Sequence, residues 1–225
     1  MPASLTSPLD LYCERLGPGF WAEPLNALSN GGFLIAAWLA WRLAGTLPGR
    51  TPWMTHLLIG LLATIGVGSF LFHTLAVTWA MWADVIPIFL YQLLFLVLYL
   101  GRVARVRPLV GLGWVALFFV ASWGFAALPT QWLNGSLSYG SAFMFVAGIA
   151  IHHWRSWQRE PRSLALATLL FTLSLICRSL DMQACNWLST GTHPLWHLLN
   201  AGVLYLSTRA VVMNEDRYQG HPSPP

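Results

Sequence analysis

Three histidines and two other polar residues stand out in a chain that is otherwise strongly apolar. Ser69 and His73 lie four residues apart in GSFLFHT, and His193 and His197 have the same spacing in HPLWH. Residues four apart share one face of a helix, so each pair points in a single direction. A histidine in a membrane is costly unless it faces a polar interior or binds a ligand. The spacing therefore indicates two helix faces that carry imidazoles for a specific purpose.

Zinc chemistry is the use that these residue types suggest. Three neutral imidazoles around an open fourth position, here His73, His193 and His197, are the ligand set of a catalytic zinc ion. Zinc lowers the pKa of bound water to about 7, and the resulting nucleophile can attack a carbonyl. Asp84 is predicted to act as general base and then as proton donor to the leaving group. Ser69 is predicted to hydrogen-bond to the water or to an oxyanion, because a hydroxyl is a weak zinc ligand.

The composition places these residues in a membrane protein. The chain has 225 residues, of which 56% are hydrophobic and 9% are charged, whereas a soluble domain carries roughly 25% charged residues. The net charge of +4 comes from arginine alone, without any lysine. These arginines lie in short loops between apolar runs, where they set membrane topology, so no nucleic-acid partner is expected. The expected surroundings are a lipid bilayer.

Seven apolar runs are long enough to cross that bilayer, since a spanning helix needs about 20 mostly apolar residues. An all-α, seven-helix membrane bundle that forms one domain over 1–225 is therefore expected. Trp79 and Trp82 suit an interfacial turn, and Asp84 suits the start of the third helix rather than a bilayer centre. The predicted spans are 24–44, 53–73, 84–101, 108–128, 137–155, 163–181 and 193–213.

The arginines support an odd number of spans. Only Arg15 and Arg178 fall on one side of this arrangement, and the other ten flank alternate connections on the opposite side. Cytoplasmic loops are rich in arginine, so the N-terminus is predicted outside and the C-terminus in the cytoplasm. Segment 1–23 is then an acidic outer segment, and 214–225 is a disordered cytoplasmic tail. The ten arginines are Arg42, Arg50, Arg102, Arg105, Arg107, Arg155, Arg159, Arg162, Arg209 and Arg217.

This topology brings the chemistry to one depth. The outer ends of the second, third and seventh helices hold His73, Asp84 and His193, although the three segments are far apart in sequence. MPASLTSPLD contains no cleavable signal peptide, so the first helix is expected to act as its own insertion signal. Arginine without lysine is typical of a GC-rich genome, and we expect a multi-pass protein of a bacterial cytoplasmic membrane with its site toward the outer face.

Other polar residues have two interpretations each. Arg178 and Asp181 are three apart and can form an ion pair on the sixth helix, or they can support the metal ligands from outside. The asparagines Asn26, Asn30 and Asn200 can hydrogen-bond between helices or orient the ligating histidines. Residues interpreted as interfacial or as helix packing are His56, His152, His153, Ser29, Ser207 and Cys177.

Four stretches of the chain resemble the alkaline ceramidase family. They are DLYCER…FWAEPLNALSN (10–30), GVGSFLFHTLAVTWAMWAD (66–84), CRSLDMQAC (177–185) and HPLWHLLNA (193–201). That family belongs to a superfamily of seven-helix membrane hydrolases, which also includes the adiponectin and progestin receptors. The resemblance implies hydrolysis of the ceramide amide bond to a sphingoid base and a fatty acid. It also implies zinc bound by His73, His193 and His197, with Ser69 and Asp84 contacting the zinc-bound water.

The resemblance further implies a calcium site in the N-terminal segment. Its ligands would be Asp10, Glu14, Glu23 and the backbone carbonyl of Tyr12, since calcium favours carboxylate and carbonyl oxygens. Two departures weaken the match. The aspartate lies one residue further from the CE pair than in eukaryotic members, and Leu16 stands where an asparagine is expected. The alternative is an acidic interfacial segment or an ion pair with Arg15.

A disulfide between Cys13 and Cys185 is also implied by the resemblance, and both cysteines map to the side where disulfides form. The predicted protein is thus a zinc-dependent membrane amidase that acts in sphingolipid or other lipid metabolism, on ceramide or another N-acyl lipid. The first alternative is a seven-helix lipid receptor with a structural zinc ion. A transporter is disfavoured, because its path would need polar groups at the midplane. The sequence indicates no particular protein partner.

Overall fold

The computed structural model describes residues 4–219, with side chains up to residue 215 in the last helix. Within that range the chain is helical and forms no β-strand beyond one isolated bridge between Pro8 and Val77. The helices are α1 (Pro24–Ser29), α2 (Gly31–Thr46), α3 (Trp53–Leu75), α4 (Thr78–Leu98), the π-helix η1 (Tyr99–Val103), α5 (Pro108–Ala126), the 3₁₀ segment η2 (Trp132–Tyr139), α6 (Gly140–Arg155), α7 (Ser163–Ala184) and α8 (His193–Gln219).

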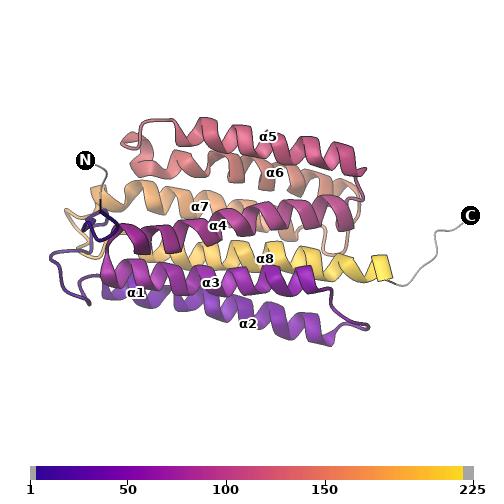
Figure 1. The fold of residues 1–225 in the computed structure, drawn as a ribbon, viewed down its shortest axis with the longest axis horizontal. Helices are drawn as coiled ribbons and strands as arrows, with labels where there is room; N and C mark the ends of the chain where they lie inside the picture. Colours follow the sequence, from indigo (N-terminus) through magenta and orange to yellow (C-terminus); the bar gives the residue numbers. More distant parts are fainter. Residues whose placement is uncertain (1–3, 220–225) are drawn as a thin grey trace, which may run out of the picture.

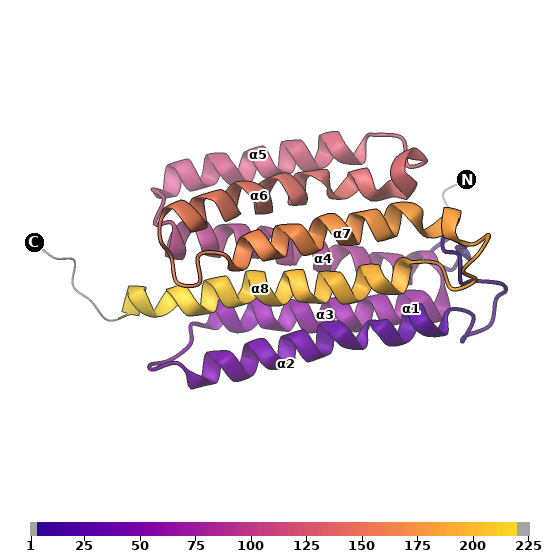
Figure 2. The same cartoon turned by 180° about the vertical axis from the view of Figure 1, so that it is seen from behind.

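The described helices are grouped along the chain into seven rods. The rods lie side by side as a bundle (Figures 1 and 2). α1 and α2 form one rod, because Asn30 between them keeps helical backbone angles. α8 packs against α7 and α2 and also reaches α3 and α4. The loops α2–α3, η1–α5 and α6–α7 lie at the end where α8 finishes. The N-terminal segment lies at the other end, where α8 begins.

Five of the rods in the described range could cross a membrane by length and composition: α3, α4 with η1, α5, η2 with α6, and α7. Their surfaces suit lipid, since α5 buries only Phe118 while Leu109 is 81% exposed and Trp123 is 78% exposed. The other two rods are less apolar or built from shorter helices. α8 carries the two histidines of HPLWH, and the helices of the first rod have 6 and 16 residues. The integral membrane class is supported, and the count of seven spans and their orientation stay predictions.

The start of the third predicted span was wrong. α4 begins at Thr78, not at Asp84, so the connection to α3 consists only of Ala76 and Val77. Ala76 adopts a left-handed conformation with φ of 46°. The backbone there is bonded by the N-terminal segment, because the N–H of Leu9 donates to the carbonyl of Ala76 at 2.8 Å. A partner from elsewhere in the chain thus allows a tight turn where a longer interfacial turn was expected.

The predicted disordered tail also begins too early. α8 continues to Gln219, and Asn214 and Glu215 are buried at its end. The side chain of Asn214 accepts a hydrogen bond from the N–H of Arg159 at 2.9 Å. Polar side chains with partners on neighbouring elements therefore prolong the helix beyond its apolar part. Residues 220–225 lie outside the described residues.

Candidate metal centre

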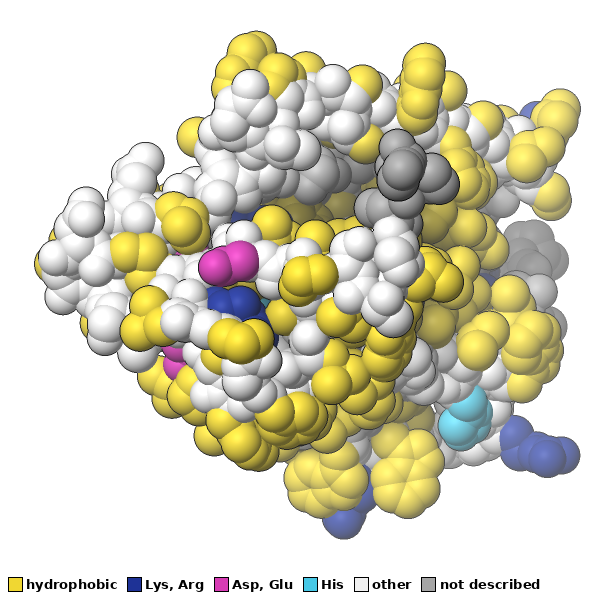
Figure 3. Space-filling view, turned by 60° about the vertical axis from the view of Figure 1, so that its left-hand side comes forward, with side chains coloured by type: hydrophobic (Ala, Val, Ile, Leu, Met, Phe, Trp, Pro, Cys, Tyr) yellow, Lys and Arg dark blue, Asp and Glu magenta, His cyan; other side chains and the backbone are white. Residues whose placement is uncertain are grey.

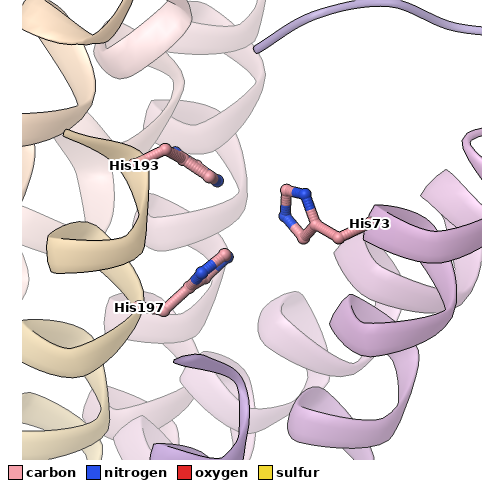
Figure 4. Close-up of side chains that lie close together, drawn as sticks. All are labelled: His73, His193 and His197. Carbon is pink, nitrogen blue, oxygen red and sulfur yellow. The ribbon is translucent and has the colours of Figure 1, made fainter. Parts of the chain in front are cut away.

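His73, His193 and His197 come together between two helices. His73 lies in the last turn of α3, and the other two histidines lie in the first turns of α8. One ring nitrogen of each lies within 4.8 Å of the others, and all three side chains are buried. Figure 4 shows the three rings pointing toward a common space. The α8 pair shares one face, as its spacing predicted, and the packing of α3 against α8 supplies the third imidazole.

Two of these rings are oriented by hydrogen bonds on their far side. Nδ1 of His73 lies 2.5 Å from Oε2 of Glu23, and Nδ1 of His197 lies 2.8 Å from Oγ of Ser29. A carboxylate only accepts hydrogen bonds, so Nδ1 of His73 carries the proton and its Nε2 presents a lone pair. Metal-binding histidines are commonly held in this way, through the nitrogen that does not bind the metal.

The ring of His193 is held by aromatic faces instead. It stacks on Tyr12 with ring centroids 3.9 Å apart and on Trp196 at 5.0 Å. Among the described residues, neither ring nitrogen of His193 has a hydrogen-bond partner, and the same holds for Nε2 of His73. Buried polar atoms almost always have partners, so these unmatched nitrogens fit a metal ion well. The centre of the three rings is therefore a candidate zinc site.

Asp84 and Ser69 lie beside this centre. Both are buried, Ser69 can hydrogen-bond to Asp84, and Oγ of Ser69 is 3.4 Å from Nε2 of His197. Oδ1 of Asp84 has no partner within the described part of the chain. Gly68 makes this arrangement possible, because a Cβ there would lie 2.0 Å from the carbonyl oxygen of Ala83. The close approach of α3 to α4 at this glycine thus brings the hydroxyl and the carboxyl to the histidines.

The predicted ion pair between Arg178 and Asp181 does not form between these two described residues. Asp181 instead accepts hydrogen bonds from three backbone N–H groups, those of Cys13 at 3.1 Å, Thr192 at 2.8 Å and His193 at 2.9 Å. Free N–H groups at a helix start attract a carboxylate more directly than a side chain on the same helix does. Asp181 therefore fixes the start of α8, and with it the backbone of His193.

Arg178 is held by aromatic rings. Its guanidinium lies 5.8 Å from the ring of Tyr12, 5.5 Å from Tyr139 and 5.6 Å from Trp196. Its NH1 group also donates to the hydroxyl of Tyr12 at 3.3 Å. Cation–π contacts of this kind gain strength away from water. Arg178 therefore contacts the aromatic residues around His193, and its support of the metal ligands stays a prediction.

The N-terminal segment covers the centre. A disulfide joins Cys13 to Cys185, and the neighbouring Tyr12 packs on both His73 and His193. Burial raises the pKa of the Tyr12 phenol despite the opposing effect of Arg178. Burial also favours a neutral Glu23, but the hydrogen bonds from His73, Asn26 and Arg15 outweigh it and lower the pKa of that carboxyl. Glu23 is therefore charged at neutral pH. Figure 3 shows acidic and basic side chains gathered near the middle of this end.

The residues predicted to bind calcium are not gathered in the same way. Asp10 is exposed, and Glu14 accepts the N–H groups of Leu25 and Asn26, both at 2.8 Å, at the start of α1. Glu23 is bonded to Arg15, His73 and Asn26. Among the described side chains, the ligating atoms of the histidine triad lie within 4.8 Å of one another, and no group of three that includes these carboxylates comes together in this way. The carboxylates therefore do not fit a calcium ion as they are arranged.

Sequence reasoning missed three contributors to the site. Ser29 was interpreted as helix packing, yet its hydroxyl contacts His197. The side chain of Tyr12 and the guanidinium of Arg15 were not predicted to reach the histidines. Ser29 follows Asn26 by three residues, as expected for two side chains that face one side of a helix, and this was the available signal.

The three described histidines outside the candidate metal centre differ in their burial. His56 and His152 are exposed, as predicted for interfacial residues. His153 is wrong as an interfacial residue, because it is fully buried and bonds to the hydroxyl of Tyr99 at 3.1 Å and to the carbonyl of Arg159 at 3.2 Å. Of the asparagines, Asn26 donates to Glu23, which bonds to His73, whereas Asn200 donates to the carbonyl of Trp196 in its own helix.

An apolar cavity lies next to the histidine centre. It holds about 680 Å³ of space unfilled by protein atoms, part of it open to the surroundings. Trp196, whose ring stacks on His193, forms part of its wall. Further wall residues come from α4, α5 and α6, among them Tyr91, Phe118 and Ala142. A long apolar group in this cavity would therefore end close to the three histidines.

The sequence of this chain matches a known protein family. The family model described as Ceramidase matches residues 5–222, nearly the whole chain. No curated protein matches the chain. The match includes both helices that supply the histidines and the N-terminal segment that covers them.

Proposed function

Because this chain belongs to the Ceramidase family, we propose that it is a zinc-dependent membrane amidase. It hydrolyses the amide bond of ceramide or a related N-acyl lipid to a free fatty acid and an amine-bearing base. The observation that carries this proposal is the convergence of His73, His193 and His197, whose rings include three nitrogens without partners among the described residues, one in His73 and two in His193. The arginine distribution favours a site toward the outer membrane face.

Zinc is the metal that suits this donor set. Neutral imidazoles are preferred zinc ligands, and catalytic zinc sites use three protein ligands with a fourth position open. When bound, zinc would lower the pKa of a water molecule and polarise a carbonyl. Glu23 and Ser29 hold two of the rings through their Nδ1 atoms, which leaves Nε2 of His73 and of His197 directed inward. A structural site would be closed by four ligands, so the three-histidine set favours catalysis over the receptor alternative.

Asp84 is the proposed general base and general acid. Its Oδ1 is buried and unpartnered within the described residues, beside the histidines, so it can accept a proton from the attacking water. The same oxygen can then deliver that proton to the nitrogen of the leaving amine. Ser69 can hydrogen-bond to Asp84 and is close to His197, so it orients the carboxyl or the carbonyl oxygen of the substrate.

The apolar cavity is the proposed acyl-chain site. Its wall is mostly aromatic and aliphatic, and Trp196 places it directly beside His193. Such a wall can receive an acyl chain from the bilayer, because both surroundings are apolar and ligand sites are lined mainly by hydrophobic and aromatic side chains. The carbonyl at the end of the chain would then meet the histidines. This arrangement favours an N-acyl lipid over a soluble amide as substrate.

The test compares metal content and hydrolysis in matched variants. Purified wild type, His197→Ala and His153→Ala are assayed for zinc and for fatty-acid release from ceramide in detergent. His153 is an equally buried histidine at the other end of the bundle, with both ring nitrogens bonded. We expect near-stoichiometric zinc and hydrolysis in wild type, loss of both in His197→Ala, and zinc retained in His153→Ala.

Two results would contradict the proposal. Wild type without zinc, after purification free of chelators, would remove the metal centre. Wild type that holds zinc but releases no fatty acid from ceramide or from a panel of other N-acyl lipids would favour the receptor alternative.

A further inference from the structure

We propose that Arg15 is a positioning residue whose guanidinium takes the place of a bound cation in the N-terminal segment, so that Glu23 and His73 are held in place without calcium. Arg15 is one residue after Glu14 in the DLYCER stretch and is only 7% exposed. The expected effect of Arg15 on zinc binding rests on the proposed function. The expected absence of calcium binding does not.

The guanidinium of Arg15 bonds to three oxygens from three different parts of the segment and its neighbour α3. Its Nε donates to Oε1 of Glu23, NH1 donates to the carbonyl of Gly17 at 3.1 Å, and NH2 donates to the carbonyl of His73 at 3.1 Å. A carboxylate and two backbone carbonyls are oxygen types that calcium favours. The positive charge that these oxygens require is therefore already supplied by the chain.

The remaining oxygens of the segment offer little to a calcium ion. Both carboxylate oxygens of Glu14 accept backbone N–H groups at the start of α1, and Asp10 is exposed. Leu16 is 89% exposed and brings no side-chain oxygen where an asparagine was expected. Calcium takes about 6–8 oxygen ligands, so a site here would have to displace Arg15 and break the first turn of α1.

Arg15 acts on the metal centre through His73. It bonds to the backbone carbonyl of His73 and to Glu23, whose other oxygen accepts from Nδ1 of the same histidine. Without the guanidinium, Glu23 would be a buried carboxylate with part of its charge unmatched. An arginine fork fixes direction as well as charge, so it holds the carboxylate toward His73. Arg15 therefore fixes one ligand ring from both its side chain and its backbone.

The first measurement uses wild type alone and needs neither zinc nor hydrolysis. The protein is purified in calcium-depleted buffer, its calcium content is measured by mass spectrometry, and its thermal midpoint is followed as calcium chloride is added, with magnesium chloride as the control. We expect no bound calcium and equal midpoints with either salt. Stoichiometric calcium, or a midpoint raised by calcium and not by magnesium, would overturn the proposal.

The second measurement compares zinc affinity in Arg15→Ala, Arg15→Lys and Arg209→Ala. Arg209 bonds to Glu160 at the opposite end of the bundle and serves as the matched arginine control. We expect zinc affinity to fall about 10–100-fold in Arg15→Ala, as for other residues that orient metal ligands. Arg15→Lys should recover part of it, because an ammonium keeps the charge without the fork, and Arg209→Ala should equal wild type.

Unchanged zinc affinity in Arg15→Ala would also overturn the proposal. If Arg15→Ala does not fold, the calcium measurement on wild type and the affinity of Arg15→Lys decide. A wild type that binds zinc tightly, ignores calcium and hydrolyses no N-acyl lipid would refute the proposed function while supporting the role of Arg15.

Discussion

The two ends of the bundle treat buried polar atoms in opposite ways. At the end with the N-terminal segment, buried atoms of His73, His193 and Asp84 have no hydrogen-bond partner among the described residues. At the end where α8 finishes, both oxygens of the buried Glu215 accept from Thr55, at 2.6 and 2.7 Å, and one also pairs with Arg102. Within the described range, Ser163 is the exception at that second end.

His193 and His153 illustrate how the two ends differ. Both are fully buried; His193 begins α8, and His153 lies in the last turn of α6. Both ring nitrogens of His153 are bonded, whereas those of His193 have no partner in the described part of the chain. Burial alone therefore does not distinguish a functional histidine. Unused hydrogen-bonding capacity distinguishes the end that contains the candidate metal centre.

The largest expected effect tests the unpartnered carboxyl. Asp84→Asn should lower amide hydrolysis by about 10²–10⁴-fold, because the amide cannot take and return a proton. Zinc content should stay at the wild-type level, since Asp84 is not a proposed ligand. Fatty-acid release and metal analysis on the same preparation check both, with Glu160→Gln as the matched control at the other end. Hydrolysis near the wild-type rate in Asp84→Asn would remove this residue from the mechanism.

At the end where α8 finishes, we expect a substitution to change the stability of the protein instead of its hydrolytic activity. Glu215→Gln leaves Arg102 without its counter-ion, and breaking a buried ion pair costs about 3 kcal/mol or more. Arg102 is partly exposed, so the lower value is expected. Denaturant unfolding in detergent measures this, and zinc stoichiometry should not change. Loss of zinc with unchanged stability would show that the two ends are not independent.

A smaller effect is expected at Ser29, which contacts Nδ1 of His197. Ser29→Ala should weaken zinc binding by about 10–100-fold, because the ring loses the hydrogen bond that orients it. Competition with a zinc chelator of known affinity measures the change. The control is Ser207→Ala, which changes a buried serine further along α8 and should bind zinc as wild type does. Equal affinities would show that the packing around His197 is sufficient.

The smallest effect concerns how stability depends on pH at the end where α8 finishes. The hydrogen bond from Arg209 lowers the pKa of Glu160 below its ordinary value of 4.5. A carboxyl with a lowered pKa in the folded state contributes stability above pH 4.5, and that stability is lost as the pH falls through the lowered pKa. The pair is partly exposed, so the contribution is at most about 1 kcal/mol. Glu160→Gln should flatten the fall of the thermal midpoint below pH 4.5 by this amount, and an identical fall in both proteins would contradict it.

Helix periodicity and charge asymmetry predicted what depends on local sequence. His193 and His197 were placed on one face at one end of the bundle, together with His73, because spacing and span limits decide that. Contacts between distant segments were not predictable in this way. Tyr12 stacks on His193, and Asp181 bonds to the start of α8, although their own neighbours in sequence suggest other partners.

The errors have the same physical origin. The pairing of Arg178 with Asp181 was allowed by their spacing, but free backbone N–H groups of the α7–α8 connection compete for the carboxylate. The start of α4 was placed at Asp84 because a charged residue is costly in lipid, yet in the bundle this carboxyl faces the protein interior. Tertiary packing determined the partner of Asp181 and the start of α4, and such packing cannot be inferred from one sequence alone.

The position of the histidines on the second and the last rods has a consequence for synthesis. Four rods separate α3 from α8 in the chain, so α3 leaves the ribosome well before α8 does. His73 is therefore made before five further rods, and its hydrogen-bond partner Glu23 is made earlier still. The proposed metal centre therefore cannot form before α8 has been made. A chain truncated before α8 would lack two of the three proposed ligands, so we expect it to bind no zinc and to hydrolyse no lipid.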